Sequence, residues 1–106
     1  MKLMTEEIRR SLPDLGETDG QGDDAIARLK LFTPTGRMTL YVTEFDGEDT
    51  LFGYMVSPLG PDCDEWGYSS LRELAEVRVF GGAMAGVERD RYFTPKSVRD
   101  CLEERA

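Results

Sequence analysis

The stretch RMTLYVTEFDGEDTLFGYMVS, residues 37–57, decides the fold because it has the composition of two strands joined by a turn. Thr, Tyr, Val, Leu and Phe dominate both halves, and these residues favour a pleated, half-buried surface. Asp46-Gly47 tolerates the left-handed backbone of a hairpin turn, and Glu48 and Asp49 indicate a connection longer than two residues. The stretch therefore predicts an antiparallel hairpin.

Two further strands extend this hairpin along the chain in both directions. Residues 25–33 alternate apolar and charged side chains, and Pro34-Thr35-Gly36 then makes a turn. After a polar, turn-rich segment at 58–65, residues 66–69 form a fourth, short strand. We expect an antiparallel meander of three to four strands.

Capping patterns predict helices on both sides of the meander. Thr5 precedes two glutamates, which suit the positive end of a helix, and Pro13 ends that helix. Residues 70–73, Ser-Leu-Arg-Glu, have the spacing of a capping box. Thr94 and Pro95 begin a last helix as its cap and first residue, and this helix buries its apolar side chains, which are Val98, Cys101 and Leu102.

These elements predict an α+β fold. We expect an N-terminal helix, the antiparallel meander, and two short C-terminal helices packed on the sheet. The glycine-rich segment 80–86 between those helices is predicted to be a mobile connector. A chain of 106 residues fits one domain, so we expect residues 1–106 to fold as a single unit.

The charge of the chain is negative and unevenly spread. The sequence holds 13 basic and 21 acidic side chains, a net charge of −8. Residues 37–65 carry one basic and seven acidic side chains, a net of −6. Such a region repels a polyanion, because affinity for nucleic acid comes from cations that displace the counterions of phosphates. We therefore expect direct nucleic-acid binding to be disfavoured.

Several chemistries are excluded by composition. The chain has no histidine, which removes Ser-His-Asp and Cys-His nucleophiles and the commonest transition-metal ligand. Cys63 and Cys101 lie 38 positions apart, too far for a Cys-x-x-Cys motif, so neither a disulfide framework nor a zinc site is indicated. No signal peptide or membrane-spanning run is apparent. We expect a cytoplasmic, non-enzymatic protein with free thiols, no cofactor and no membrane partner.

One cluster remains as a candidate site. Four carboxylates crowd the predicted turn within six residues: Glu44, Asp46, Glu48 and Asp49. Such groups repel one another unless a cation or a basic partner neutralises them. Three interpretations stay open: a solvated turn, an acidic surface that docks onto a basic protein, and a Mg²⁺ or Mn²⁺ site of hard oxygen ligands.

Five ordered segments carry a resemblance that covers nearly the whole chain. They are AIARLKLFTP at 25–34, TLYVTEFDGED at 39–49, LFGYMVSP at 51–58, WGYSSLRELAEV at 66–77 and ERDRYFTP at 88–95. Together they resemble a bacterial family catalogued only as a domain of unknown function. The resemblance implies a setting on plasmids and integrative elements, whose genes serve maintenance, transfer or evasion of host defence. It brings no catalytic residues.

The preferred interpretation is a small acidic interaction module of a mobile genetic element that docks its acidic hairpin onto a basic host or element-encoded protein. An inhibitor of a host defence system, of the anti-restriction or anti-CRISPR type, is one form of this hypothesis. The alternatives are a Mg²⁺- or Mn²⁺-dependent hydrolase that uses the same carboxylates and an accessory factor in plasmid maintenance.

Overall fold

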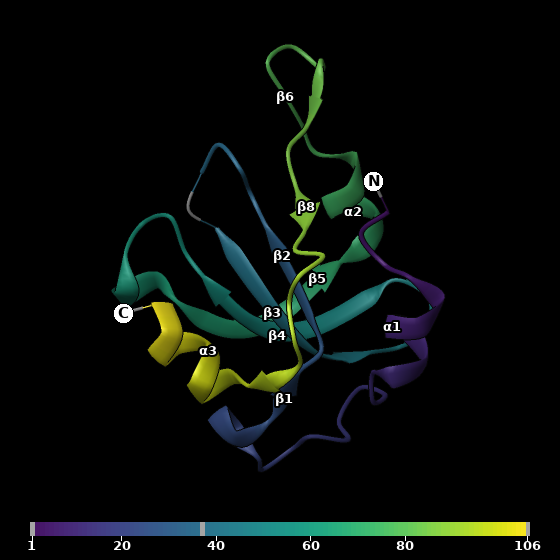
Figure 1. Ribbon diagram of the computed structural model, residues 1–106, viewed down its shortest axis with the longest axis vertical. Coiled ribbons are helices and arrows are strands. Elements are labelled where there is room, and N and C mark those ends of the chain that lie inside the picture. Colours follow the sequence, from purple (N-terminus) through teal and green to yellow (C-terminus); the bar gives the residue numbers. More distant parts are fainter. Residues whose placement is uncertain (1, 37, 106) are drawn as a thin grey trace.

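A computed structural model describes residues 2–36 and 38–105 of the chain, and these residues form a five-stranded antiparallel sheet at the centre of the molecule (Figure 1). The order of the strands across the sheet is β5-β4-β3-β2-β8. Their bounds are β2 Leu29–Phe32, β3 Thr39–Phe45, β4 Thr50–Val56, β5 Glu65–Ser70 and β8 Glu88–Arg89. The predicted α+β fold and its meander are confirmed, and β8 adds a fifth strand by pairing with β2.

The predicted strand over 25–33 is wrong in one respect, because the chain breaks it at Arg28. The first part, β1 (Ile26–Ala27), pairs with β9 (Lys96–Ser97) in a separate two-stranded ladder. Only the second part, β2, joins the main sheet. The partner of β1 lies about seventy residues away along the chain, so local alternation of side chains could not reveal the break.

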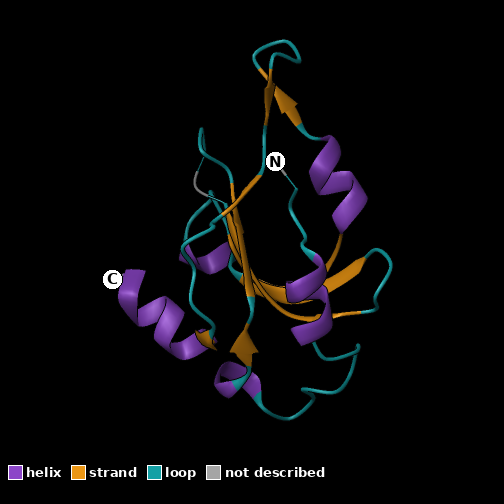
Figure 2. Cartoon of the chain, turned by 45° about the vertical axis from the view of Figure 1, so that its right-hand side comes forward, coloured by secondary structure: helices purple, strands orange, loops and turns teal. Residues whose placement is uncertain are grey.

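The segment 80–86, predicted to be a mobile connector, lies largely within a hairpin, and its mobility stays a prediction. The strands β6 (Arg78–Val79) and β7 (Met84–Ala85) pair antiparallel, and Figure 2 shows their hairpin projecting from the body of the molecule. Gly81 and Gly82 have φ angles of 68° and 94°, so glycine supplies the left-handed backbone that the tight turn needs.

The helices are α1 Glu6–Ser11, α2 Leu71–Glu76 and α3 Val98–Arg105, with short 3₁₀ turns η1 Gly22–Asp24 and η2 Pro61–Cys63. The predicted caps of the first two are confirmed: Thr5 Oγ1 accepts a hydrogen bond from the Ile8 amide at 3.1 Å, and Ser70 Oγ accepts one from the Glu73 amide at 3.2 Å.

The predicted start of the last helix at Thr94 and Pro95 is wrong. Lys96 and Ser97 pair with β1 as a strand, so the helix cannot begin before Val98. Ser97 Oγ accepts a hydrogen bond from the Asp100 amide at 3.1 Å and thus satisfies a backbone donor of the first turn.

The sheet carries a hydrophobic cluster on each side. Helices α1 and α2 cover one side, and α3 covers the other (Figure 2). The first cluster is built from buried aliphatic residues and Phe45: Leu3, Leu12, Leu29, Leu31, Leu40, Val42, Phe45, Leu51 and Val87. The second is smaller and consists of Ala27, Tyr41, Val98 and Cys101. Partly buried residues of β4 and β5 pack against this second cluster: Tyr54, Val56 and Trp66.

No helix in the described part of the chain combines the length and the apolar character needed to cross a membrane. Cys63 is exposed and Cys101 is buried, and both are free thiols. Burial raises the pKa of the Cys101 thiol, so this group is held in its neutral form within the second cluster.

Candidate functional site

The four carboxylates predicted to share a surface point to different parts of the molecule. Glu44 is only 2% exposed, and the register of β3 against β4 shifts between Val42 and this residue. Such an irregularity re-aims a side chain. Glu44 Oε1 accepts a hydrogen bond from the Gly16 amide at 2.8 Å, and Oε2 accepts one from the Thr18 amide at 2.8 Å and another from the Thr18 hydroxyl. Glu44 therefore fastens the loop at 16–18 to the sheet.

Asp46 organises the turn in which it lies. Its Oδ1 accepts backbone hydrogen bonds from residues 48, 49 and 50 at 2.8, 2.8 and 3.0 Å. These bonds lower the pKa of the Asp46 carboxyl, and those from the Glu48 and Asp49 amides have the largest effect. Gly47, at φ 88°, takes the left-handed conformation that the sequence predicts for it.

Asp49 joins the turn to α2. Its Oδ2 accepts a hydrogen bond from the Ser70 hydroxyl at 2.6 Å, and its Oδ1 accepts one from the Arg72 amide at 2.7 Å. These two bonds, with that of Ser70 the stronger influence, lower the pKa of the Asp49 carboxyl. The side chain thus satisfies a free amide in the first turn of α2.

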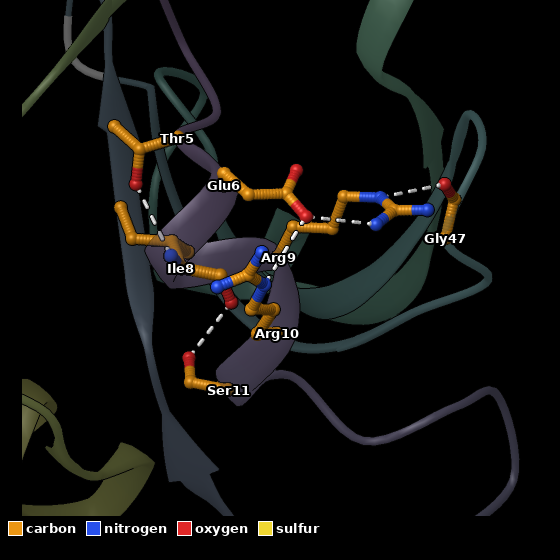
Figure 3. Close-up of polar contacts among 7 residues, drawn as sticks. All are labelled: Thr5, Glu6, Ile8, Arg9, Arg10, Ser11 and Gly47. Carbon is orange, nitrogen blue, oxygen red and sulfur yellow. Dashed lines mark hydrogen bonds and ion pairs between the residues drawn. The ribbon is translucent and has the colours of Figure 1, made fainter.

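A cation already lies at the same turn. Figure 3 shows the Arg9 side chain reaching from α1 to the turn, where its Nε donates a hydrogen bond to the Gly47 carbonyl at 3.1 Å. Arg9 Nη1 also contacts Glu6 Oε1 at 3.2 Å. The segment 44–49 is therefore a junction between α1, the loop at 16–18 and α2. Among its carboxylates, Glu48 is exposed, and its side chain makes no hydrogen bond or ion pair within the described residues.

Within the described residues, no group of three or more acidic or cysteine side chains is placed to hold a metal ion. The carboxylates of the 44–49 segment diverge, and three of the four accept backbone or hydroxyl hydrogen bonds. These hydrogen bonds tie the 44–49 segment to the elements around it.

A different surface has the character of a binding site. Four aromatic side chains form a continuous face on neighbouring strands β4 and β5: Phe52, Tyr54, Trp66 and Tyr68. We call this the aromatic face. The Phe52 and Trp66 rings stack with centroids 5.6 Å apart, and the tilted Tyr68 ring has its centroid 4.9 Å from that of Phe52. Tyr68 remains 70% exposed, so its ring is available for contact with a partner.

A small hollow opens beside the aromatic face. It has a volume of about 190 Å³ and lies between the rings of Phe52 and Trp66 and the loop at 18–22. Thr18, which contacts Glu44, belongs to the wall of this hollow. Glu44, which the sequence predicts to be part of a docking surface, therefore affects the aromatic face only indirectly, through the loop that it fastens.

Carboxylates lie around this face. Asp19 lines the hollow. Burial, followed by the negative charges of Asp64 and Asp23, raises the pKa of the Tyr54 phenol. The surroundings of the aromatic face thus favour a positively charged ligand.

The aromatic face ends at an open sheet edge. β5 is the last strand in the order of the sheet, and no described strand pairs with its outer side. An unpaired edge presents a row of amide and carbonyl groups that can bind an extended chain. β5 is six residues long, and the backbone groups of alternate residues point to this outer side.

The strands β4 and β5 could be predicted from the sequence, but this surface was not identified. A usable signal was present: Phe52 and Tyr54 are two residues apart, and so are Trp66 and Tyr68. Residues at this spacing share one face of a strand, so two such pairs on neighbouring strands meet on one side of the sheet.

Comparison with known proteins gives the chain a family. The family described as "Protein of unknown function (DUF2958)" matches residues 3–100. Neither the curated proteins nor the solved structures contain a match to the chain.

Proposed function

Because the chain belongs to this family of unknown function (DUF2958), we propose a function from its surface chemistry: it is a protein-interaction module that binds an extended, basic segment of a partner protein along β5 and the aromatic face. One observation carries the proposal. The exposed Tyr68 belongs to the unpaired edge strand itself, and its ring contacts that of Phe52 on the neighbouring strand.

An added strand would use both parts of this surface. Backbone groups of the partner would pair with the outer side of β5 and supply affinity, while every second side chain of the partner would lie over the aromatic face and supply specificity. The rigid aromatic rings lose little conformational freedom on contact, which suits them to this role.

The chemistry of the face selects the partner's side chains. Arginine or lysine placed over Tyr68 or Trp66 gains a cation–π interaction. Asp19, Asp23 and Asp64 add electrostatic attraction, which speeds association and weakens with salt. This keeps the basic partner that the sequence predicts but moves the contact from the 44–49 segment to the aromatic face.

The mobile-element setting implied by the resemblance extends the proposal. An extended basic segment with which a host defence nuclease contacts nucleic acid has the charge that this surface would meet. Expression of the protein should then raise the transformation of unmodified plasmid into a host with active restriction, and the Tyr68→Ala variant should not. Equal transformation with and without the protein would exclude this form of the proposal.

The binding surface predicts a specific peptide preference. A peptide of about ten residues, the length of a long strand, that alternates arginine and valine should bind saturably. Trp66 is the single tryptophan and lies in the face, so its fluorescence reports binding. Tyr68→Ala should weaken affinity about tenfold, the loss of roughly 1.4 kcal/mol of cation–π and contact energy. Added salt should weaken binding further.

Matched controls separate this surface from general charge attraction. A peptide that alternates glutamate and valine should leave the fluorescence unchanged. The Tyr92→Ala variant removes another highly exposed tyrosine, 89% accessible and remote from β5 in sequence and contacts, and should bind the arginine peptide as the parent does. Equal binding of both peptides, or no effect of Tyr68→Ala, would show that the face is not the recognition surface.

A further inference from the structure

A second surface of the molecule has the opposite charge. A groove of about 600 Å³ lies between the end of the β2–β3 hairpin, the β8 strand with the residues after it, and the C-terminal end of α3. Figure 1 shows β8 running beside β2, which brings residues near 90 to those near 30. This volume is within the range of small-molecule sites.

Cations gather around this groove from three separate parts of the chain. Its lining holds four of them: Lys30, Arg89, Arg91 and Arg105. Arg89 pairs with Leu31, a residue of the first cluster, and its Nε donates to the Lys2 carbonyl at 3.1 Å, so its side chain lies on the other side of the sheet from Lys30. The other three cations and the two lining carboxylates, Glu88 and Asp90, leave a local excess of one positive charge in a chain whose net charge is −8. None of the seven acids of residues 37–65 appears among the described lining residues.

Several of these groups are held in place by contacts that leave donors available. Lys30 Nζ lies 3.5 Å from Asp90 Oδ2, with both side chains 27% exposed. Arg105 Nη1 donates to Thr39 Oγ1 at 3.2 Å. A guanidinium has five N–H donors, so Arg105 can still donate to a ligand while it keeps this bond. Arg91 is exposed at the rim.

Tyr92 supplies a flat ring at the same groove. It is the most exposed of the large apolar side chains in the described residues, at 89%. Its backbone is held, because its amide donates to Asp90 Oδ1 at 2.9 Å and the Asp90 amide donates to the Lys30 carbonyl at 3.0 Å. A second hollow of about 200 Å³ also has Tyr92 in its lining, so this residue borders both spaces.

We propose that this groove binds a free mononucleotide, with its phosphates held by Arg91 and Arg105 and its base stacked on Tyr92. Arginine suits phosphate because its planar donors form paired, charge-assisted hydrogen bonds. Aromatic rings stack on any base, whatever its sequence. The acidic remainder of the chain repels a long polyanion, so the site favours a ligand with few phosphates.

ADP is the probe for this site, and calorimetry measures its binding to the full chain. ADP should bind saturably, and adenosine and inorganic pyrophosphate should each bind more weakly because each keeps only one half of the contacts. Arg91→Ala should reduce ADP affinity about tenfold, as expected for a lost hydrogen bond to a charged group. Tyr92→Ala should reduce it about tenfold through lost stacking and leave pyrophosphate affinity unchanged.

Two control variants leave the groove intact. Tyr68→Ala alters the aromatic face, and Arg72→Ala removes an exposed arginine on α2; both should bind ADP as the parent does. Absence of saturable ADP binding at about 1 mM would overturn the proposal. Tighter binding of a short single-stranded oligonucleotide than of ADP would overturn the assignment to a free mononucleotide, and equal ADP binding by Tyr92→Ala would overturn the stacking.

Discussion

Gly53→Ala should lower the free energy of unfolding by about 3 kcal/mol, or prevent folding altogether. Gly53 lies in the middle of β4, opposite Val42 of β3 and Gly67 of β5. A Cβ atom at this position would meet the Tyr41 carbonyl oxygen at 2.1 Å and the Val42 Cα at 2.9 Å. These are backbone atoms of the central strand, so relief requires the β3–β4 pairing to open. Urea denaturation measures the loss.

The matched control is the glycine on the neighbouring strand. A Cβ atom at Gly67 would meet nothing within 4 Å. Gly67→Ala should therefore leave the free energy of unfolding within about 0.5 kcal/mol of the parent. Equal stability of the Gly53→Ala and Gly67→Ala variants would contradict the close approach of β3 and β4 at this point.

Glu44→Gln should lower the free energy of unfolding by about 2–3 kcal/mol. The side chain is buried, and three donors from Gly16 and Thr18 point at its two oxygens. Glutamine replaces one of these oxygens with an NH₂ group, which faces a donor and leaves it without an acceptor. Chemical denaturation gives the loss of stability, and the amide signals of residues 16 and 18 report the release of the loop.

The exposed Glu48 provides the control for this change. Glu48→Gln removes the same charge two residues beyond the turn aspartate, and should alter the free energy of unfolding by less than about 0.5 kcal/mol. If both glutamine variants were equally stable, the carboxylate of Glu44 would not be the group that fastens the loop.

The Glu44 carboxylate also makes the free energy of unfolding depend on pH. Burial raises the pKa of Glu44, but the hydrogen bonds from Thr18 and Gly16 together outweigh it, so the pKa lies below its ordinary value. The folded state thus binds this proton less readily than the unfolded state. The stabilisation is complete above the unfolded pKa and is lost as the pH falls through the folded pKa. Glu44→Gln should therefore lose less stability than the parent on acidification.

The local elements could be predicted because their signals are local. The turn at Asp46-Gly47 and the caps at Thr5 and Ser70 depend on residues within four positions of one another. The start of α3 could not be predicted in this way, because it depends on pairing of Lys96 and Ser97 with β1.

The candidate site was harder to predict from the sequence, because its contacts join residues that are far apart in the chain. From the sequence, Glu44 and Asp49 were expected to repel each other as neighbours in solvent. In the structure, Glu44 binds a loop 26–28 residues earlier in the chain, and Asp49 binds α2. The groove has the same origin, because Lys30 and Arg91 meet only through the pairing of β2 with β8. The aromatic face differs, since its spacing in the sequence contained the necessary information.

The most direct test of the proposed interaction module is amide hydrogen exchange of the full chain with and without the alternating arginine–valine peptide. Strand addition predicts slower exchange at the β5 amides that point away from β4, and unchanged exchange at β8 on the opposite edge of the sheet. Exchange at β5 that stays the same while the peptide is bound would contradict the proposal that β5 receives the partner.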